Sequence, residues 1–241
     1  MADHQILIVG GGAAGIATAA SLHKRDASLD IAIIEPSATH YYQPGWTMVG
    51  AGIFKKEETA RSTASVMPSY VTQIRGTVAS FQPDENSVRL EDGKALTYGS
   101  LVVAAGLKLD WAAIEGLEEA LGRNGVTSNY RYDLAPYTWE LVQKMRGEKA
   151  IFTQPPMPIK CAGAPQKAMY LSCSTWMQVG KIKDIDVSFC NAGPVLFGCA
   201  DYVPPLMEYV DRYGINLDFG YNLVKVDGPN QIATFKVAKE G

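Results

Sequence analysis

Short apolar runs alternate with predicted helices from the start of the chain. Residues 6–9 are continuously apolar, which is typical of a strand buried on both faces of a parallel sheet. A glycine-rich turn follows at once, residues 16–25 predict an alanine-rich helix, and residues 31–35 form a second apolar strand. This order predicts a β-α-β unit with the usual right-handed crossover.

The middle of the chain changes its pattern twice. Residues 36–65 carry prolines and glycines without periodicity, so we expect a long loop, which in a compact domain is usually functional. Residues 70–98 alternate in short stretches around a turn at 91–94, which predicts a small antiparallel meander. Residues 98–106 are then expected to return a buried strand to the main sheet.

The alternation of strands and helices begins again after residue 148. Before it, residues 107–130 predict a loop with a weak helical patch, and residues 134–145 predict an amphipathic helix. The second α/β unit is expected to contain strands at 149–153, 185–189 and 215–219, helices at about 165–179 and 204–213, and the start of a second meander at 223–237.

The predicted fold class is therefore α/β, with two Rossmann-like lobes in tandem. We place a dinucleotide-binding lobe in residues 1–110, a connecting segment in 111–148 and a second lobe in 149–241. Because the second meander has no returning strand before Gly241, we expect the fold to be incomplete at its C-terminus.

Composition and charge exclude several classes of partner. The chain has 241 residues, of which 47% are hydrophobic, and a net charge of −3. That balance gives no basic surface for nucleic acid and no sign of attraction to an anionic membrane. No stretch approaches the ~20 apolar residues of a transmembrane helix, and the first residues lack the features of a signal peptide. We therefore expect the chain to start in the cytoplasm.

The glycine-rich turn has the spacing of a dinucleotide site. Gly10, Gly12 and Gly15 give G-x-G-x-x-G between a strand and a helix, where the glycines allow a tight turn, close approach of a pyrophosphate and close packing. Glu35 ends the next strand, where an acid accepts hydrogen bonds from ribose hydroxyls and disfavours a 2′-phosphate. The motif does not separate FAD from NAD, but a strand at 101–106 that ends in small residues favours a flavoprotein.

Cys161 is the candidate reactive thiol. It follows Lys160 and precedes a helix that we expect to begin near Pro165. A helix N-terminus and a neighbouring ammonium both favour the thiolate. A small buried residue in a loop is the alternative that position alone leaves open. The same loop carries only Gly163 among prolines, so the second lobe is expected to bind no nicotinamide.

No other group of residues suggests a metal or disulfide site. The four cysteines contain no C-x-x-C pair and no zinc spacing, and three of them are expected to be packing residues, namely Cys173, Cys190 and Cys199. The histidines form no ligand cluster. A surface role is expected for His40, with a place near a flavin as the alternative.

These pieces together resemble the sulfide:quinone oxidoreductases, particularly the type shared by proteobacteria and mitochondria. The resemblance covers essentially the whole chain, and its most specific segment is Lys160–Lys167, K-C-A-G-A-P-Q-K. The other segments that carry it are Ile8–Gly12, Ile33–Pro36, His40–Trp46, Val49–Gly52 and Leu196–Gly198 with Tyr202 and Leu206.

The resemblance implies a flavoprotein with the fold of two dinucleotide-binding domains. It implies that FAD contacts Gly10, Gly12, Ala13, Ala14, Gly15, Glu35, Gln43, Val78, Ala105 and Gly106. Cys161 would be the redox cysteine on the flavin side and would carry a persulfide. Hydrogen sulfide would be oxidised, the electrons would pass through FAD to a quinone, and the sulfane sulfur would leave to an acceptor.

The resemblance places other parts of the family's machinery beyond Gly241. These are the second redox cysteine, the quinone pocket and the C-terminal helices that bind the membrane, so a peripheral place on the inner membrane is an expectation for that region. Two alternatives stay open. One is a type II NADH:quinone oxidoreductase of related fold, which the missing second glycine motif disfavours. The other is a non-catalytic flavin-binding or interaction fragment.

Overall fold

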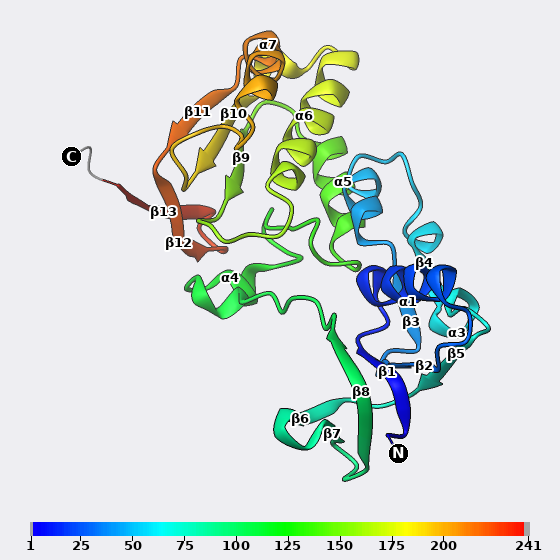
Figure 1. Ribbon diagram of the computed structural model, residues 1–241. Helices are drawn as coiled ribbons and strands as arrows, with labels where there is room; N and C mark the ends of the chain where they lie inside the picture. The colour runs from blue at the N-terminus through cyan, green and yellow to red at the C-terminus, as the bar shows by residue number, and fades with distance from the viewer. Residues whose placement is uncertain (1, 239–241) are drawn as a thin grey trace. The chain divides into compact units, whose positions relative to one another are not determined.

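The protein, a computed structural model that describes residues 2–238, consists of two compact units (Figure 1). The first contains the described residues up to Tyr42 together with Ala60–Lys108. The second contains Gln43–Thr59 together with the described residues from Leu109 onward. The division into a dinucleotide-binding lobe (1–110), a connecting segment (111–148) and a second lobe (149–241) stays a prediction. The two compact units do not by themselves show which part of the chain binds a nucleotide.

The first unit is built on a sheet of six strands. Its order is β5-β2-β1-β8-β7-β6, with β5, β2, β1 and β8 parallel and β8, β7 and β6 antiparallel. The strands are β1 (His4–Val9), β2 (Ile31–Ile34), β5 (Val71–Ile74), β6 (Val78–Gln82), β7 (Ser87–Leu90) and β8 (Ala95–Val103). The other elements are α1 (Ala13–Arg25), β3 (Thr39–Tyr41), β4 (Ala60–Ser62), α3 (Thr63–Val66) and a 3-10 turn, η3 (Pro83–Glu85).

The apolar run of β1 is buried on both faces, as its sequence predicts. Leu7 and Val9 belong to one core cluster, whereas Ile8 belongs to another cluster that includes Ala19 of α1. Both Leu7 and Ile8 are fully inaccessible to solvent. Burial on two faces is why this strand reads as a continuous apolar run instead of an alternating one.

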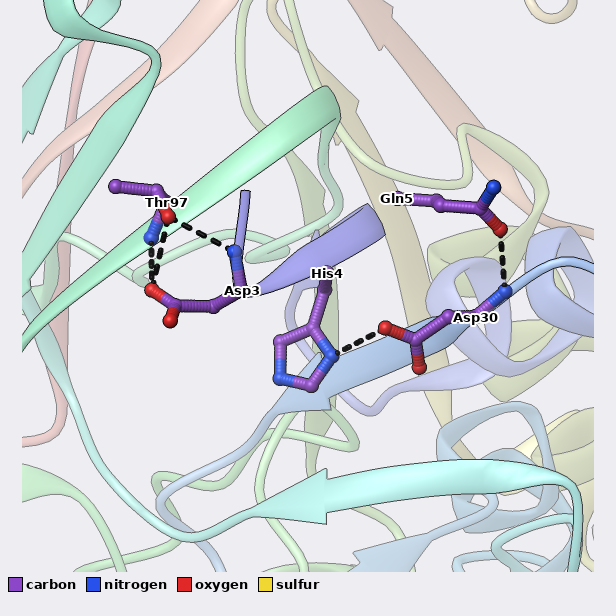
Figure 2. A network of polar contacts seen from close by, with 5 residues as sticks. All are labelled: Asp3, His4, Gln5, Asp30 and Thr97. Carbon is purple, nitrogen blue, oxygen red and sulfur yellow. Dashed lines mark hydrogen bonds and ion pairs between the residues drawn. The ribbon is translucent and has the colours of Figure 1, made fainter. Parts of the chain in front are cut away.

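Hydrogen bonds connect the amino-terminal end of β1 to β8 on one side and to the start of β2 on the other (Figure 2). The carboxylate of Asp3 accepts hydrogen bonds from the backbone N–H (2.8 Å) and hydroxyl (2.9 Å) of Thr97 in β8. These bonds, the backbone bond first, hold the pKa of the Asp3 carboxyl below its ordinary value. On the other side, His4 Nδ1 lies 2.9 Å from Asp30, whose N–H donates to the side chain of Gln5 at 2.8 Å. The contacts help to fix the register that brings the glycine turn beside the end of β8.

The second unit contains a smaller parallel sheet with helices packed against it. The sheet has the order β11-β10-β9, and its core includes Met169, Cys173 and Phe189, all fully buried. The elements of the sheet are β9 (Lys149–Gln154), β10 (Asp186–Asn191) and β11 (Asn216–Phe219), with helices α5 (Ala135–Lys144), α6 (Gly163–Gln178) and α7 (Val203–Tyr213). The remaining elements are the hairpin β12 (Tyr221–Asp227) with β13 (Ile232–Val237), the short helices α2 (Trp46–Val49) and α4 (Leu117–Ala120), and the 3-10 turns η1 (Gln43–Gly45), η2 (Lys56–Thr59), η4 (Trp111–Ala113), η5 (Ile182–Asp184) and η6 (Ala200–Tyr202).

Several predicted elements need correction. Val71–Ile74 is a parallel edge strand of the main sheet and not part of the meander. The loop at 36–65 holds the β3–β4 ribbon, and its central part, Gln43–Thr59, packs with the second unit. Helix α6 begins at Gly163, so Pro165 is the third helical residue and not the first.

The returning strand is also longer and less buried than predicted. Strand β8 begins at Ala95, runs from the meander into the parallel sheet, and ends at Val103, which is 60% exposed. Among residues 2–238 no helix is both long enough and apolar enough to cross a bilayer.

Candidate functional site

The glycine turn of the first unit lies against the carboxyl end of β8. The β1–β8 register pairs Val9 with Val103, and the N–H of Ala104 donates to the carbonyl of Val9 at 2.7 Å. Gly10 has φ +107°, and a β-carbon there would lie 2.3 Å from the carbonyl oxygen of Ala104. A β-carbon on Gly15 would lie 1.9 Å from the carbonyl oxygen of Gly10. Both positions therefore require glycine.

Gly12 differs from the other two glycines because it faces open space. A β-carbon there would meet nothing within 4 Å. Gly12 is the N-cap of α1 and has no side-chain cap, and Ala13 and Ala14 after it are exposed. The first N–H groups of α1 are thus accessible at the positive end of the helix dipole, which is how dinucleotide folds receive a pyrophosphate.

The carboxylate of Glu35 is fixed beside this turn. It accepts the N–H of Gly11 at 2.7 Å through one oxygen and the N–H of Ser37 at 2.7 Å through the other. Each carboxylate oxygen keeps a further lone pair for a ribose hydroxyl. An accessible helix N-terminus, a glycine without neighbours and an oriented carboxylate fit the pyrophosphate and ribose of a dinucleotide.

His40 contacts the backbone of the glycine turn. It lies in β3, is half-buried, and its Nδ1 is 3.3 Å from the carbonyl oxygen of Gly11. Because a carbonyl only accepts, Nδ1 carries the proton. His40 and Glu35 therefore contact the two polar backbone groups of Gly11, which is a contact that the expected surface role did not include.

The remaining predicted FAD residues fall into two groups. Ala105 and Gly106 follow β8 and are exposed, and Val78 is half-buried at the start of β6. Nine of the ten predicted FAD residues belong to the first unit, whereas Gln43 belongs to the second. Gln43 lies in η1 and lines a cavity there together with Cys161.

Cys161 is exposed and has an unusual backbone conformation. Its φ is +61°, which non-glycine residues rarely adopt. Its carbonyl accepts the N–H of Ala164 at 2.9 Å in the first turn of α6. The predicted place of the thiol just before a helix is confirmed, since α6 begins two residues later.

The cavity beside Cys161 is small and carries positive charge. Its volume is about 30 Å³, and Lys160 and Lys167 are among its lining residues. Asn129, which also lines it, has a buried side-chain oxygen without a hydrogen-bond partner among the described residues. A cavity of this volume admits at least one water-sized solute. The residues of the wall are Gln43, Pro44, Thr47, Asn129, Tyr130, Lys160, Cys161, Ala164 and Lys167.

Sequence patterns could not identify most of this wall. Asn129 and Tyr130 belong to the irregular stretch before α5, where no periodicity indicates a side chain's direction. Lys167 had a signal, because it lies six residues after Cys161 in the segment that carries the family resemblance.

A second cavity lies at the carboxyl end of β10. Its volume is about 390 Å³ and its wall is apolar, with Leu196, Phe197 and Met207 among the lining residues. Nearby, the fully buried side chain of Asn191 donates to the carbonyl of Val195 at 2.9 Å. The turn after β9 carries prolines at 155, 156 and 158, which have no N–H to donate to a pyrophosphate.

The other cysteines divide into two buried and one exposed. Cys173 is fully buried in the core, which raises the pKa of its thiol to about 12. Cys190 is 5% exposed, and burial, followed by the nearby Asp218, raises the pKa of its thiol to about 11. The packing prediction is confirmed for these two. It is wrong for Cys199, which is exposed. No metal-binding group of histidine, cysteine or acidic residues occurs among the described residues.

Thiol labelling checks this division. In the native chain at pH 8, we expect iodoacetamide to modify Cys161 and Cys199 and to leave Cys173 and Cys190 intact, because the buried thiols are inaccessible and protonated. Peptide mass spectrometry measures the result, and labelling in urea, where all four should react, is the control. Native labelling of Cys173 as fast as that of Cys161 would contradict the described burial.

Comparison with known proteins places these features in a family. The family model described as pyridine nucleotide-disulphide oxidoreductase matches residues 4–140. The mitochondrial sulfide:quinone oxidoreductase of Dictyostelium discoideum is 41% identical over 235 residues, which are 96% of this chain and 52% of that protein. The mitochondrial enzyme of Mus musculus is 38% identical over 97% of this chain and 52% of that protein. The chain thus spans about half the length of these curated relatives.

Solved structures of other proteins have the same fold as this chain. The sulfide:quinone oxidoreductase of Aquifex aeolicus matches with a TM-score of 0.79 at 21% identity, over 97% of this chain and 56% of that chain. Putidaredoxin reductase in its complex with putidaredoxin matches with a TM-score of 0.64 over 97% of this chain and 54% of that chain.

The α/β fold with a parallel sheet is therefore that of the Rossmann-like flavoproteins, and the proteins of the matching family depend on FAD. The family model covers the glycine turn, Glu35 and the end of β8, and these are the features that fit a dinucleotide here. The chain belongs to the pyridine nucleotide-disulphide oxidoreductase family.

Proposed function

We propose that the protein is a sulfide:quinone oxidoreductase, in which sulfide is oxidised to sulfane sulfur at Cys161 and the two electrons pass through FAD to a quinone. The observation that carries the proposal is an exposed cysteine on the wall of a small cavity lined by two lysines. Relatives with this name at 38–41% identity support it.

The first unit supplies the cofactor site in this proposal. The open N–H groups of α1 bind the pyrophosphate, and Glu35 binds the ribose of FAD. FAD supplies, when bound, a two-electron acceptor that a quinone can reoxidise. The residues that we propose as FAD contacts are Gly10, Gly12, Ala13, Ala14, Gly15, Glu35, Gln43, Val78, Ala105 and Gly106.

The second unit supplies the thiol chemistry. The lysines of the cavity wall attract the hydrosulfide anion toward Cys161. Hydrosulfide attacks a disulfide between Cys161 and a second cysteine, so that an S–S bond breaks, a persulfide forms and one thiolate is released. The sulfane sulfur of the persulfide then leaves to an acceptor, and both cysteines remain as thiols. Re-forming their disulfide would release the two electrons that FAD would accept when bound.

The partner cysteine is not assigned within the chain. Cys173 and Cys190 are buried, and Cys199 does not match the position of the partner cysteine that the resemblance implies. We propose that the second cysteine, the quinone site and any membrane contact belong to a region with no counterpart in the described residues.

A type II NADH:quinone oxidoreductase is the competing function. The enzyme of that name from Mycobacterium tuberculosis is 32% identical over 43% of this chain. The proline-rich turn after β9 does not favour it, because a nicotinamide dinucleotide needs N–H donors at that turn.

Flavin spectroscopy separates the two functions. In the FAD-loaded, full-length protein under anaerobic conditions, we expect sulfide to bleach the flavin absorbance near 450 nm within seconds and NADH to leave it unchanged. Addition of a soluble quinone should restore the absorbance after sulfide. Bleaching by NADH and not by sulfide would overturn the proposed function in favour of its competitor.

A further inference from the structure

The left-handed backbone of Cys161 is held by a tyrosine from another part of the second unit. The hydroxyl of Tyr130 lies 2.7 Å from the carbonyl oxygen of Lys160 and 3.2 Å from that of Cys161. Its single proton is therefore donated to a pair of consecutive carbonyls. Two carbonyls that point at one donor restrict the peptide between them, and that peptide leads directly into the strained residue.

Tyr130 is itself fixed in place. Its backbone N–H donates to the hydroxyl of Ser128 at 3.1 Å, and the ammonium of Lys160 lies 6.0 Å from the centre of its ring. Burial, followed by the proximity of Cys161, raises the pKa of the Tyr130 hydroxyl to about 12. The hydroxyl therefore keeps its proton, and its capacity to donate, throughout the neutral range.

The conformation matters because it determines where the sulfur lies. Cys161 and Tyr130 both line the 30 Å³ cavity, and Lys160 and Lys167 line it as well. With a negative φ, which a cysteine ordinarily prefers, the β-carbon of residue 161 would leave the backbone in a different direction. The thiol would then lose its place on the lysine-lined wall.

We propose that Tyr130 is a positioning residue for Cys161: its hydroxyl keeps the cysteine in the left-handed conformation that places the thiol on the wall of the lysine-lined cavity. The inference concerns this thiol in any reaction and does not depend on sulfide being the substrate. Its failure can therefore be distinguished from failure of the proposed function.

Thiol reactivity tests the inference in the native chain. In a Cys199→Ser background, where Cys161 is the one exposed thiol among the described cysteines, Tyr130→Phe should lower the rate of reaction of Cys161 with methyl methanethiosulfonate at pH 7.5 at least fivefold. Tyr170→Phe is the matched control. Tyr170 belongs to the same unit, its hydroxyl donates to the carbonyl of Leu206 at 3.3 Å, and burial also raises its pKa to about 12.

The control separates positioning from general stability. Each substitution removes one tyrosine hydroxyl that donates to backbone carbonyl oxygen, two carbonyls for Tyr130 and one for Tyr170, so both should lower the melting temperature by a few degrees. Only a positioning role changes the reaction rate of the thiol in the folded state, so Tyr170→Phe should stay within twofold of the parent. Equal rates in Tyr130→Phe and the parent would overturn the proposal.

A second measurement tests the conformation directly, and its first comparison does not require Tyr130→Phe to fold. Glycine adopts φ +61° without strain and alanine does not, so Cys161→Gly should melt at a higher temperature than Cys161→Ala. In chains that also carry Tyr130→Phe this difference should shrink, because the alanine is then free to relax. The proposal is overturned if alanine is as stable as glycine at 161, or if the difference is the same with phenylalanine at 130.

Discussion

Replacing Gly15 with alanine is expected to abolish measurable FAD binding and to destabilise the first unit by about 3 kcal/mol. The β-carbon would lie 1.9 Å from the carbonyl oxygen of Gly10, a backbone atom that cannot rotate away. Helix α1 would have to shift away from β1, and its N–H groups would no longer meet the pyrophosphate in their original geometry. Urea denaturation and titration with FAD, followed by flavin fluorescence, measure the two effects.

Gly12→Ala is the matched variant, because it changes the same motif without a clash. Its β-carbon would have no neighbour within 4 Å, and φ at Gly12 is −76°, which alanine adopts freely. We expect its unfolding free energy to stay within about 0.5 kcal/mol of the parent. FAD affinity should still fall, because a methyl group would occupy the space into which the pyrophosphate must come. If Gly15→Ala bound FAD as the parent does, the glycine turn would not be the cofactor site.

The first lobe could be predicted from sequence because its signals are local and mutually consistent. The run at 6–9, the glycine spacing and the position of Glu35 all specify one β-α-β unit, and the structure confirms each element. The edge strand Val71–Ile74 was missed for a physical reason. An edge strand is covered on fewer sides, so two of its four residues are exposed and the apolar run that marks a buried parallel strand is absent.

The packing of Gln43–Thr59 could not be predicted, because it depends on contacts between residues that are far apart in the sequence. In the sequence, Gln43–Thr59 belongs to the long loop predicted within the first lobe. In the structure, Trp46 and Val49 of α2 are instead buried with Ala135 of α5. A β-carbon on Gly52 would lie 2.3 Å from the Trp139 ring. No local pattern signals a pairing across roughly ninety residues, which tertiary packing alone decides.

The candidate thiol site shows the same division. The order of Lys160, Cys161 and a following helix is a local feature, and the structure confirms that order. The left-handed backbone of Cys161 and the hydroxyl of Tyr130 that bonds to it are not local, since the two residues are 31 positions apart. A non-glycine residue at positive φ has no sequence signal of its own, because it exists only where the surrounding fold imposes it.

Cys161→Ser is expected to lower the rate of flavin reduction by sulfide on the order of 10³-fold in the FAD-loaded, full-length protein. A serine hydroxyl is slightly smaller than the thiol and cannot form the S–S bond through which sulfide becomes oxidised. FAD affinity should be unchanged, because the substitution exchanges a single side-chain atom and leaves every proposed FAD contact, including Gln43 on the same cavity wall, in place. Anaerobic stopped-flow absorbance measures the rate, and the flavin spectrum before mixing confirms that the cofactor is loaded.

Cys199→Ser is the control that gives this result its meaning. Cys199 is the other exposed cysteine of the described chain, and it precedes the short turn η6 far along the sequence from the K-C-A-G-A-P-Q-K segment. If exposure alone allowed a cysteine to form the disulfide that hydrosulfide attacks, both variants would be slow. If the lysine-lined wall around Cys161 is what matters, only Cys161→Ser is slow and Cys199→Ser reduces its flavin at the parent rate. If sulfide reduced the flavin of Cys161→Ser at the parent rate, Cys161 would have no redox role. A flavin-binding protein without a catalytic cysteine would then be the better account.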